Sequence, residues 1–239
     1  MFERPHHQRI AKVLQAFDRG MLERAECFFG GGTAIALGLG EYRESLDIDF
    51  LCASSEGYRF LRNTVAEELG ALLRQPVKHL RAVRADRYGI RTVLEMEGVP
   101  IKVELVSEGR IRIGGQFDPL FGVPTLARVD MYAEKLLANA DRALDKAVLS
   151  RDIIDLAMMI DGWGAIPTLA CEKAHAAYGD HVVRYFDKAI ALIGDSAYLA
   201  ACLAKMQMKA DLIDRIQGVL AAAPRWPVGA ESSRAQQGE

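Results

Sequence analysis

The chain has 239 residues, half of them hydrophobic, and a formal net charge of −2. This length allows one large or two small domains, and the near-neutral charge excludes a protein that is attractive to nucleic acid over its whole surface. The four cysteines lie far apart without a CxxC pair, which disfavours a zinc site or a disulfide framework and fits a cytoplasmic protein.

The first half of the chain alternates between helical and strand-like patterns. Apolar residues recur at helical spacing over 8–25, and the short apolar runs CFF (27–29) and LDIDFLC (46–52) predict buried strands. A helix is expected over 56–73. RYGIRTVLEMEG (87–98) and VPIKVELV (99–106) predict a hairpin that turns at Gly98–Val99–Pro100, and RIRIGG (110–115) predicts one more strand.

The second half of the chain is predicted to be helical almost to its end. The expected helices are 125–145, 150–161, 167–178, 180–194 and 196–222, with Gly and Pro between several of them. A domain boundary near 118–125 would divide the chain into an α/β domain (1–122) and a helical domain (123–224). The polar tail 225–239 is rich in breakers and predicted to be disordered. No apolar stretch approaches 18 residues, so we expect no membrane segment.

Two aspartates interrupt the second apolar run. Strand alternation places Asp47 and Asp49 on one face, about 7 Å apart, with Leu46, Ile48 and Phe50 on the other. Carboxylates this close repel each other unless a cation lies between them, and a hard divalent ion such as Mg²⁺ is a suitable one. The alternative is an acidic face that is simply solvated.

The segment FFGGGTAIAL (28–37) predicts a strand, a glycine turn and the start of a helix. In such a turn, the backbone N–H groups of Gly31 and Gly32 can approach a phosphate at the helix N-terminus. Thr33 would either cap the helix or bind a phosphate oxygen. Taken alone, the motif is more often only a tight turn.

Three ordered motifs together resemble a known family. GGTAIALGLGEYRESLDIDF, then KLLANADR, then RDIIDL are similar to the motifs of the AbiEii/AbiGii nucleotidyltransferase toxins, within the DNA polymerase β-like nucleotidyltransferase superfamily. The resemblance covers roughly 28–160. It implies an α+β fold in which a small mixed β-sheet core with flanking helices precedes a C-terminal helical bundle, with the site in the cleft between them.

The resemblance also implies roles for individual residues. Mg²⁺ would be bound by Asp47, Asp49 and Glu104. The nucleotide would be bound by Gly31, Gly32, Thr33, Arg43, Ser45, Lys135 and Arg142. Catalytic roles would fall to Asp47, Asp49, Glu104, Lys135, Asp152 and Asp155, with one of the last two as a base on the acceptor side.

Two of these assignments depart from the family or have ordinary alternatives. Superfamily members usually carry Asp where this chain has Glu104, whose side chain is one methylene longer. This leaves open whether two metal ions bind, or a single Mg²⁺ with Glu104 in a looser role. Lys135 and Arg142 share a helix face that would suit a triphosphate, with Lys135 acting as a point charge; a solvated face would look the same. Asp152 could instead stabilise a helix N-terminus.

A basic segment lies between the first of these motifs and the other two. Residues 74–91 hold an excess of cations over the single Asp86, with Tyr88 available for stacking: Arg74, Lys78, His79, Arg81, Arg84, Arg87 and Arg91. Such a segment could bind an RNA acceptor or be a solvated face. His6, His7, His175 and His181 are interpreted as surface or interhelical polar residues.

The resulting hypothesis is a Mg²⁺-dependent nucleotidyltransferase that moves an NMP from an NTP to an acceptor hydroxyl. RNA, and in particular the 3′ end of a tRNA, is the implied acceptor. The implied partner is the cognate antitoxin of a toxin–antitoxin pair. One alternative is a small-molecule nucleotidyltransferase of the antibiotic-modifying type, and another is a degenerate member that binds nucleotide or a partner without catalysis.

Overall fold

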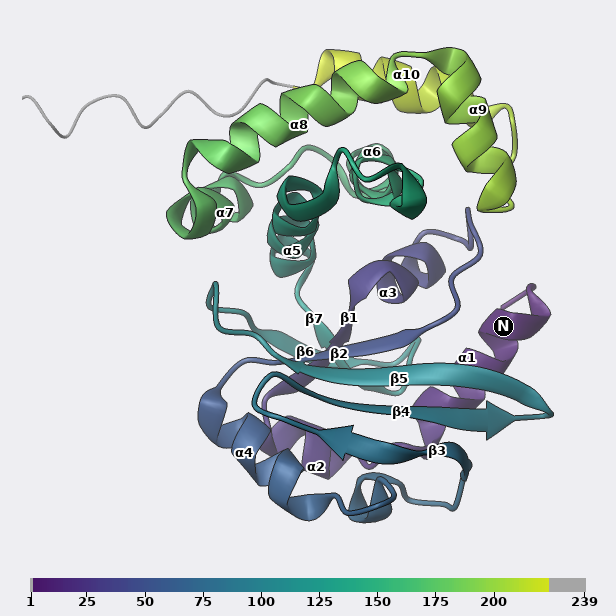
Figure 1. Cartoon of the computed structure of the whole chain (residues 1–239), viewed down its shortest axis with the longest axis vertical. Coiled ribbons are helices and arrows are strands. Elements are labelled where there is room, and N and C mark those ends of the chain that lie inside the picture. The colour runs from purple at the N-terminus through teal and green to yellow at the C-terminus, as the bar shows by residue number, and fades with distance from the viewer. Residues whose placement is uncertain (1, 224–239) are drawn as a thin grey trace, which may run out of the picture.

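A mixed seven-stranded sheet forms one half of the molecule (Figure 1), as seen in a computed structural model that describes residues 2–223. The strand order is β3-β4-β5-β2-β1-β7-β6. The strands are β1 (Cys27–Gly30), β2 (Ile48–Cys52), β3 (Lys78–Ala85), β4 (Gly89–Met96), β5 (Val99–Ser107), β6 (Gly115–Asp118) and β7 (Val123–Leu126).

The pairing of the central strands brings distant motifs together. Strand β2 runs antiparallel to β1 and parallel to β5, so Asp49 lies opposite both Gly30 and Glu104. Along β5 the residues Ile101, Val103 and Leu105 are fully buried, whereas Lys102 is exposed and Glu104 half-buried. The alternation expected for this strand is therefore confirmed, and its polar face is free to form a site.

Four helices pack against the sheet: α1 (Pro5–Ala16), α2 (Arg19–Arg24), α3 (Gly31–Gly38) and α4 (Ser55–Thr64). Helix α1 buries the stripe Ile10, Val13 and Leu14, as its helical spacing predicts. The single helix expected over 8–25 is wrong, because the chain is extended at Phe17 and Asp18 starts α2 by accepting a hydrogen bond from the Met21 N–H.

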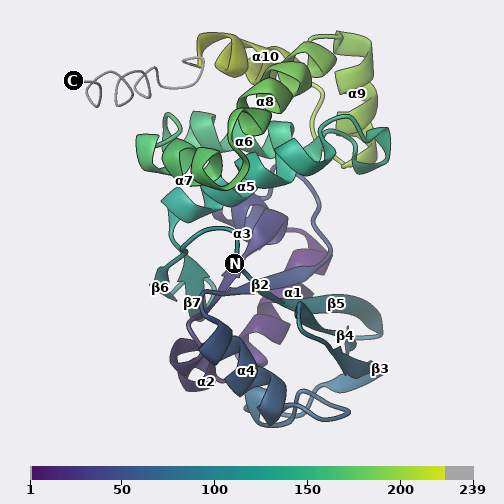
Figure 2. The same ribbon diagram turned by 60° about the vertical axis from the view of Figure 1, so that its left-hand side comes forward.

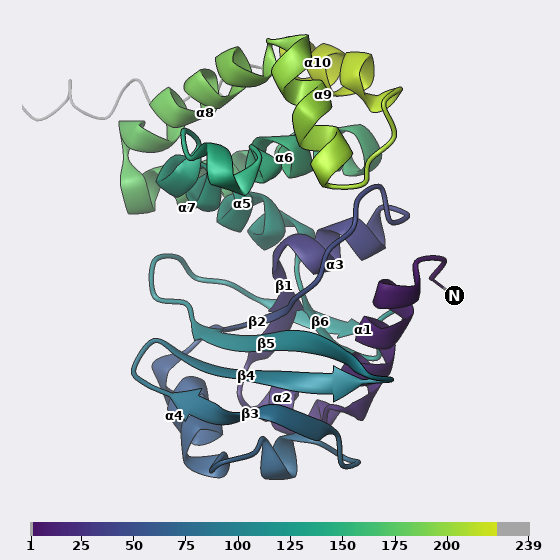
Figure 3. The ribbon, with the colours of Figure 1, turned by 45° about the vertical axis from the view of Figure 1, so that its right-hand side comes forward.

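The other half of the molecule is helical (Figures 1 and 2). It contains α5 (Arg128–Arg142), α6 (Arg151–Trp163), α7 (Thr168–Tyr178), α8 (Asp180–Ile193), α9 (Ser196–Lys205) and α10 (Leu212–Ala222). Helix α5 packs against α6, α7 and α8. The apolar helix α3 (Gly31–Gly38) lies between the sheet and these helices (Figure 3), which explains why it is buried from Thr33 to Leu37.

Several expected elements have different bounds. The helix predicted over 56–73 ends at Thr64, and only a short 3-10 turn (Gly70–Leu72) follows. The predicted helix 196–222 is interrupted after Lys205, where Gln207 has a φ of 55°. The β4–β5 hairpin turns at Glu97 and Gly98, both with positive φ, and not at Gly98–Val99–Pro100.

Strand predictions failed where burial is low. RIRIGG (110–115) is not a strand up to Ile113; the next strand, β6, begins at Gly115 and forms a hairpin with β7. Strand β3 was not expected, because it lies at the sheet edge and most of its side chains are exposed.

The proposed division of the chain needs a small adjustment. The expected boundary at 118–125 falls on the β6–β7 hairpin, which belongs to the sheet, so we keep two domains as a proposal and place the division after Leu126. The tail predicted to be disordered, 225–239, lies outside the described residues. Within residues 2–223, no helix is both long and apolar enough to cross a membrane.

Candidate active site

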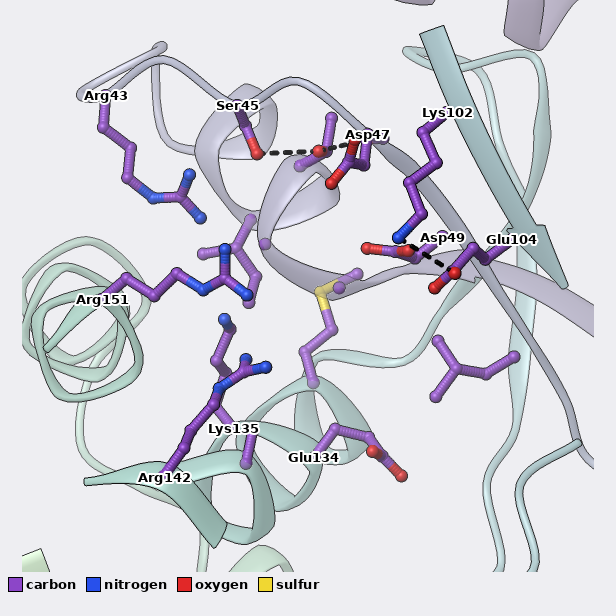
Figure 4. A pocket seen from close by; sticks show the side chains of 17 residues that line it. Arg43, Ser45, Asp47, Asp49, Lys102, Glu104, Glu134, Lys135, Arg142 and Arg151 are labelled. Atoms are coloured by element: carbon purple, nitrogen blue, oxygen red, sulfur yellow. Dashed lines mark hydrogen bonds and ion pairs between the residues drawn. The ribbon is translucent and has the colours of Figure 1, made fainter. Parts of the chain in front are cut away.

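A cavity of about 310 Å³ lies between the sheet and helices α3, α5 and α6 (Figure 4). Most of the residues singled out in the sequence line it. They are Gly31, Gly32, Thr33, Arg43, Ser45, Asp47, Asp49, Glu104, Lys135 and Arg142. The structure thus brings the three motifs and the β5 strand to one place.

The sheet side of the cavity forms an acidic wall, which we define as Asp47, Asp49 and Glu104. Asp47 immediately precedes β2, and Asp49 lies within it. Leu46 was expected on the apolar face of this strand. The strand starts only at Ile48, however, and Leu46 is 53% exposed. Burial and the charges of Asp47 and Glu104 raise the pKa of Asp49 to about 6, against the opposing charges of Lys102 and Lys135.

The acidic wall suits a divalent cation at Asp47 and Asp49. The raised pKa of Asp49 shows that its charge is incompletely compensated, and oxygen ligands of this kind bind Mg²⁺. The third carboxylate, Glu104, has two cations near it: Lys102 Nζ lies 3.0 Å and Arg91 Nε 3.3 Å from its Oε1. Within the described residues, no group of three acidic, histidine or cysteine side chains is arranged to hold a metal ion.

The glycine turn fits closely beneath the acidic wall. Gly31 has a φ of +68°, and a Cβ at this position would lie 2.7 Å from Asp49 Oδ2. A Cβ at Gly32 would collide with the Arg43 guanidinium. The N-terminus of α3 lies at the cavity and has no side-chain cap, so its first backbone N–H groups are suited to bind an anion there.

Thr33 has a different contact from the one expected. Its hydroxyl hydrogen-bonds the main-chain oxygen of Asp47 and lies 2.8 Å from Ser45 Oγ. Thr33 and Ser45 are both buried, at 1% and 8% exposure. These hydroxyls consequently fix the backbone that carries the acidic wall, and Thr33 makes no side-chain cap on α3.

The helical side of the cavity forms a basic wall, which we define as Arg43, Lys135, Arg142 and Arg151. Arg43 comes from the loop after α3, Lys135 and Arg142 from α5, and Arg151 from the start of α6. Figure 4 shows these side chains across the cavity from the acidic wall. The residues before Arg151, Leu149 and Ser150, both have left-handed backbone conformations.

Asp152 and Asp155 lie behind the basic wall and do not line the cavity. Asp155 is fully buried and accepts two hydrogen bonds from Arg43, at 2.7 and 2.9 Å, while Lys135 Nζ lies 2.7 Å away. Burial alone would raise the pKa of Asp155, but Arg43 and Lys135 lower it overall. Asp152 is bound in the same way by Lys135 and Arg142, and its pKa is also lowered.

This buried network changes two expectations. A carboxylate that is enclosed by cations and held ionised is a poor proton acceptor. We therefore propose that Asp152 and Asp155 position the side chains of the basic wall, and that neither acts as the base on the acceptor side. Lys135 is 5% exposed and forms ion pairs with both aspartates, so it is not the isolated point charge that was expected.

A fully buried histidine supports the loop between α3 and β2. His7 Nε2 accepts a hydrogen bond from the Ser45 N–H at 3.0 Å, and Nδ1 lies 2.7 Å from Glu41 Oε1. Interpreting His7 as a surface or interhelical polar residue was wrong. Only its place on the buried stripe of a helix, beside Ile10 and Leu14, could have indicated this.

Six further cavity residues were not foreseen. They are Ile35, Leu51, Lys102, Met131, Glu134 and Arg151. The alternation of β5 could have indicated Lys102, since it shares a face with Glu104. Burial raises the pKa of Glu134 to about 8, against the opposing charge of Arg110, whose Nη2 lies 2.6 Å from Glu134 Oε2.

Four cations of the basic segment lie on the same face of the sheet as the acidic wall. Lys78, Arg81 and Arg84 on β3 lie opposite Glu95, Val93 and Arg91 on β4. Arg91 in turn lies opposite Glu104 on β5. His79, by contrast, lies opposite the buried Leu94 and accepts a hydrogen bond from the Leu69 N–H, so it does not belong to this set of cations.

Comparison with known proteins supplies a family and a fold. The sequence profile described as nucleotidyl transferase AbiEii toxin, type IV toxin–antitoxin system, matches residues 16–225. No curated protein matches the chain.

Three solved structures are similar to this chain. A candidate nucleotidyltransferase from H. pylori has 12% identity and a TM-score of 0.50, covering 90% of this chain and 92% of the other, and shows a shared fold. JHP933 from Helicobacter pylori has 12% identity and a TM-score of 0.49, covering 92% of each chain. The nucleotidyltransferase toxin MenT4 from Mycobacterium tuberculosis has 17% identity and a TM-score of 0.35, covering 91% and 94%.

Proposed function

The chain belongs to the AbiEii family of nucleotidyltransferase toxins, and on this premise we propose that it transfers an NMP from a Mg²⁺-bound NTP to a hydroxyl group of RNA. The 3′ end of a tRNA is the acceptor that we favour. The nucleotidyltransferase class follows from the family; the metal, the acceptor and the residue roles below are the proposal.

The observation that carries this proposal is the opposition of two charged walls across one cavity. The acidic wall on β2 and β5 faces the basic wall on α5, α6 and the α3–β2 loop, about the N-terminus of α3. A triphosphate carries several negative charges, and it can lie against cations and helix N–H groups on one side. A divalent ion on Asp47 and Asp49 would neutralise its remaining charge.

The side chains then have distinct tasks. The N–H groups at Gly31 and Gly32 and the guanidinium groups of Arg142 and Arg151 bind phosphate oxygens. Asp47 and Asp49 would hold the divalent ion, whose charge would help to orient the nucleotide. The acceptor hydroxyl attacks the α-phosphorus in line, its new bond replaces the bond to pyrophosphate, which leaves, and the hydroxyl proton passes to solvent. Such transfer depends mainly on positioning and charge neutralisation, so a buried and fully organised set of ion pairs behind the site is an advantage.

The open face of the sheet supports RNA as the acceptor. Lys78, Arg81 and Arg84 are exposed, and strand pairing places them on the face that leads through Arg91 to Glu104 at the cavity. Figure 1 shows β3, β4 and β5 side by side from this face. A single-stranded RNA end lying across these strands would meet cations along its backbone before it enters the cavity.

The family also suggests the biological setting. Its description as a type IV toxin–antitoxin system supports a cognate antitoxin as partner. We place the protein in the cytoplasm, where its proposed substrates occur; the four cysteines are free and buried, which fits a reducing compartment.

Incubation of the protein with each labelled NTP, Mg²⁺ and total cellular RNA, followed by gel electrophoresis, tests the proposal. We expect one size class of RNA to become labelled, and Asp47→Asn to abolish the labelling. Label that appears only in small molecules would favour the antibiotic-modifying alternative. Nucleotide binding without any transfer would favour a degenerate, non-catalytic member.

A further inference from the structure

Lys102 occupies an unusual place for a lysine. It extends from β5 into the cavity, with its Nζ 3.0 Å from Glu104 Oε1. Figure 4 shows Lys102 on the same side of the cavity as Asp49 and Glu104. A positively charged side chain of the protein itself therefore lies within the acidic wall, next to Glu104.

Glu104 is thereby neutralised from two sides. Arg91 approaches its Oε1 from β4 at 3.3 Å, and Lys102 approaches the same oxygen from within β5. Arg91 is shared with the exposed Asp86, at 3.1 Å. Within the described part of the chain, Lys102 has no ion-pair partner other than Glu104. Arg91 thus divides its charge between Asp86 and Glu104, whereas Lys102 forms an ion pair with a residue of the acidic wall alone.

The charges decide how many divalent ions the wall can hold. Asp47, Asp49 and Glu104 contribute three negative charges, and Lys102 and Arg91 return two positive ones. One divalent ion at Asp47 and Asp49 already reverses the net charge of the wall. A second ion near Glu104 would also lie close to the ammonium of Lys102, and like charges within a few ångströms repel each other even where one of them is half-exposed.

We propose that Lys102 is the resident cation of this site, that it holds Glu104 out of the metal ligand set, and that it limits the chain to one divalent ion. This inference rests on the proposed function, because it assumes that Asp47 and Asp49 bind the metal of a nucleotidyltransferase. Lys102 takes over the charge compensation that a second ion would supply beside Glu104. It is a positioning and specificity-determining residue for the metal.

The test is a count of bound Mn²⁺ by the electron paramagnetic resonance signal of the free ion, with the full chain and Mn²⁺ alone. Wild type should bind one ion. Lys102→Met should bind two, and the tighter ion should bind about tenfold more strongly, because a nearby positive charge has been removed. Lys102→Arg keeps the charge and should again bind one ion.

Lys78→Met is the matched control, since it removes the same charge from the same sheet face at the remote strand β3. It should bind one ion with unchanged affinity. Two ions bound to wild type, or one ion of unchanged affinity bound to a Lys102→Met protein with a normal melting transition, would overturn the inference while leaving the proposed function intact. A wild type that binds no Mn²⁺ would overturn the metal site in the proposed function, and this inference with it.

Discussion

At the scale of single residues, the site concentrates charges that oppose folding unless a ligand is present. Asp49 is the clearest case. It lies in a strand beside Asp47 and opposite Glu104, and burial and these two carboxylates raise its pKa to about 6. A folded-state pKa above the unfolded value of about 3.9 means that folding favours the protonated form. Stability from this group is therefore complete below pH 4 and lost as pH rises through 6.

Asp49→Asn should accordingly stabilise the metal-free protein at neutral pH. In the presence of a chelator we expect a gain of at most about 3 kcal/mol in the free energy of unfolding at pH 7.5, and no gain at pH 4. Urea denaturation at both pH values measures this. Mg²⁺ should stabilise wild type but not the variant, and the variant should not transfer nucleotide. A variant that is equally destabilised at both pH values would contradict this account of Asp49.

Asp155 has the opposite electrostatic role. It is buried and bound by Arg43 and Lys135, two residues of the basic wall. Asp155→Asn would leave those cations in a buried site without a counter-charge, and we expect a loss of about 3–5 kcal/mol in the free energy of unfolding. Transfer should fall as well, because both cations lose their orientation.

The exposed Asp187 on α8 provides the matched substitution, and Asp187→Asn should change neither quantity. Urea denaturation together with the RNA-labelling assay distinguishes the two variants. If Asp155→Asn retained wild-type stability but lost transfer alone, a direct catalytic role for this carboxylate would have to be reconsidered.

At the scale of elements, the edge strand β3 contributes positive charge to the surface of the sheet and few side chains to the hydrophobic core. Its side chains are mostly exposed, yet its register with β4 fixes Lys78, Arg81 and Arg84 on the cavity face. In a regular strand residues three apart point to opposite faces, but register shifts in β3 between His79 and Arg81 and between Arg81 and Arg84 bring these cations to one face. This face is continuous with β4 and β5, so an acceptor bound to β3 is directed toward the cavity.

Neutralising Lys78, Arg81 and Arg84 together should weaken RNA binding and reduce its salt dependence by roughly one counterion for each lost phosphate contact. NTP binding should change little, because the phosphate groups are assigned to the opposite wall. Titrations of RNA and of NTP at several salt concentrations measure both effects. The matched control neutralises three exposed cations of the helical half, Arg184, Lys205 and Lys209. Equal effects of the two triple variants on RNA binding would remove β3 from the acceptor site.

At the scale of the whole molecule, the α3–β2 loop joins the two halves. His7 on α1 accepts the Ser45 N–H, and the Glu44 N–H donates to the Met206 carbonyl at 3.1 Å, between α9 and α10. Arg4 also donates to the Gln207 carbonyl at 2.8 Å. The loop that carries Arg43 and leads to Asp47 is thus held from the N-terminal helix and from the helical half at once.

His7→Ala should therefore affect stability and substrate binding together. Both ring nitrogens have buried partners, so we expect a loss of about 2–4 kcal/mol in the free energy of unfolding and weaker NTP binding, by roughly tenfold. Chemical denaturation and an NTP titration under native conditions measure these quantities. Substitution of the neighbouring exposed Gln8 by Ala should leave NTP binding unchanged. Unaltered NTP affinity in a folded His7→Ala protein would show that the loop does not need this support.

The sequence by itself determined the features that depend on local order. The pair Asp47 and Asp49 shares a side because successive strand residues alternate, and Gly31 and Gly32 leave a helix N-terminus open because they have no side chains. The spacing of Lys135 and Arg142 along one helix predicted a common face in the same way. These relations span a few residues, so backbone geometry alone fixes them.

Only the tertiary structure decided which charges meet. Arg43 and Asp155 are separated by 112 residues, and no local pattern indicates that they form a buried ion pair. Strand order likewise placed Glu104 opposite Asp49, and brought the exposed cations of β3 onto the same face. Such contacts depend on how strands pair and helices pack between residues that are far apart in the sequence. Packing also sets the free energy of burying each charge, and this determined whether a residue lines the cavity or supports it from behind.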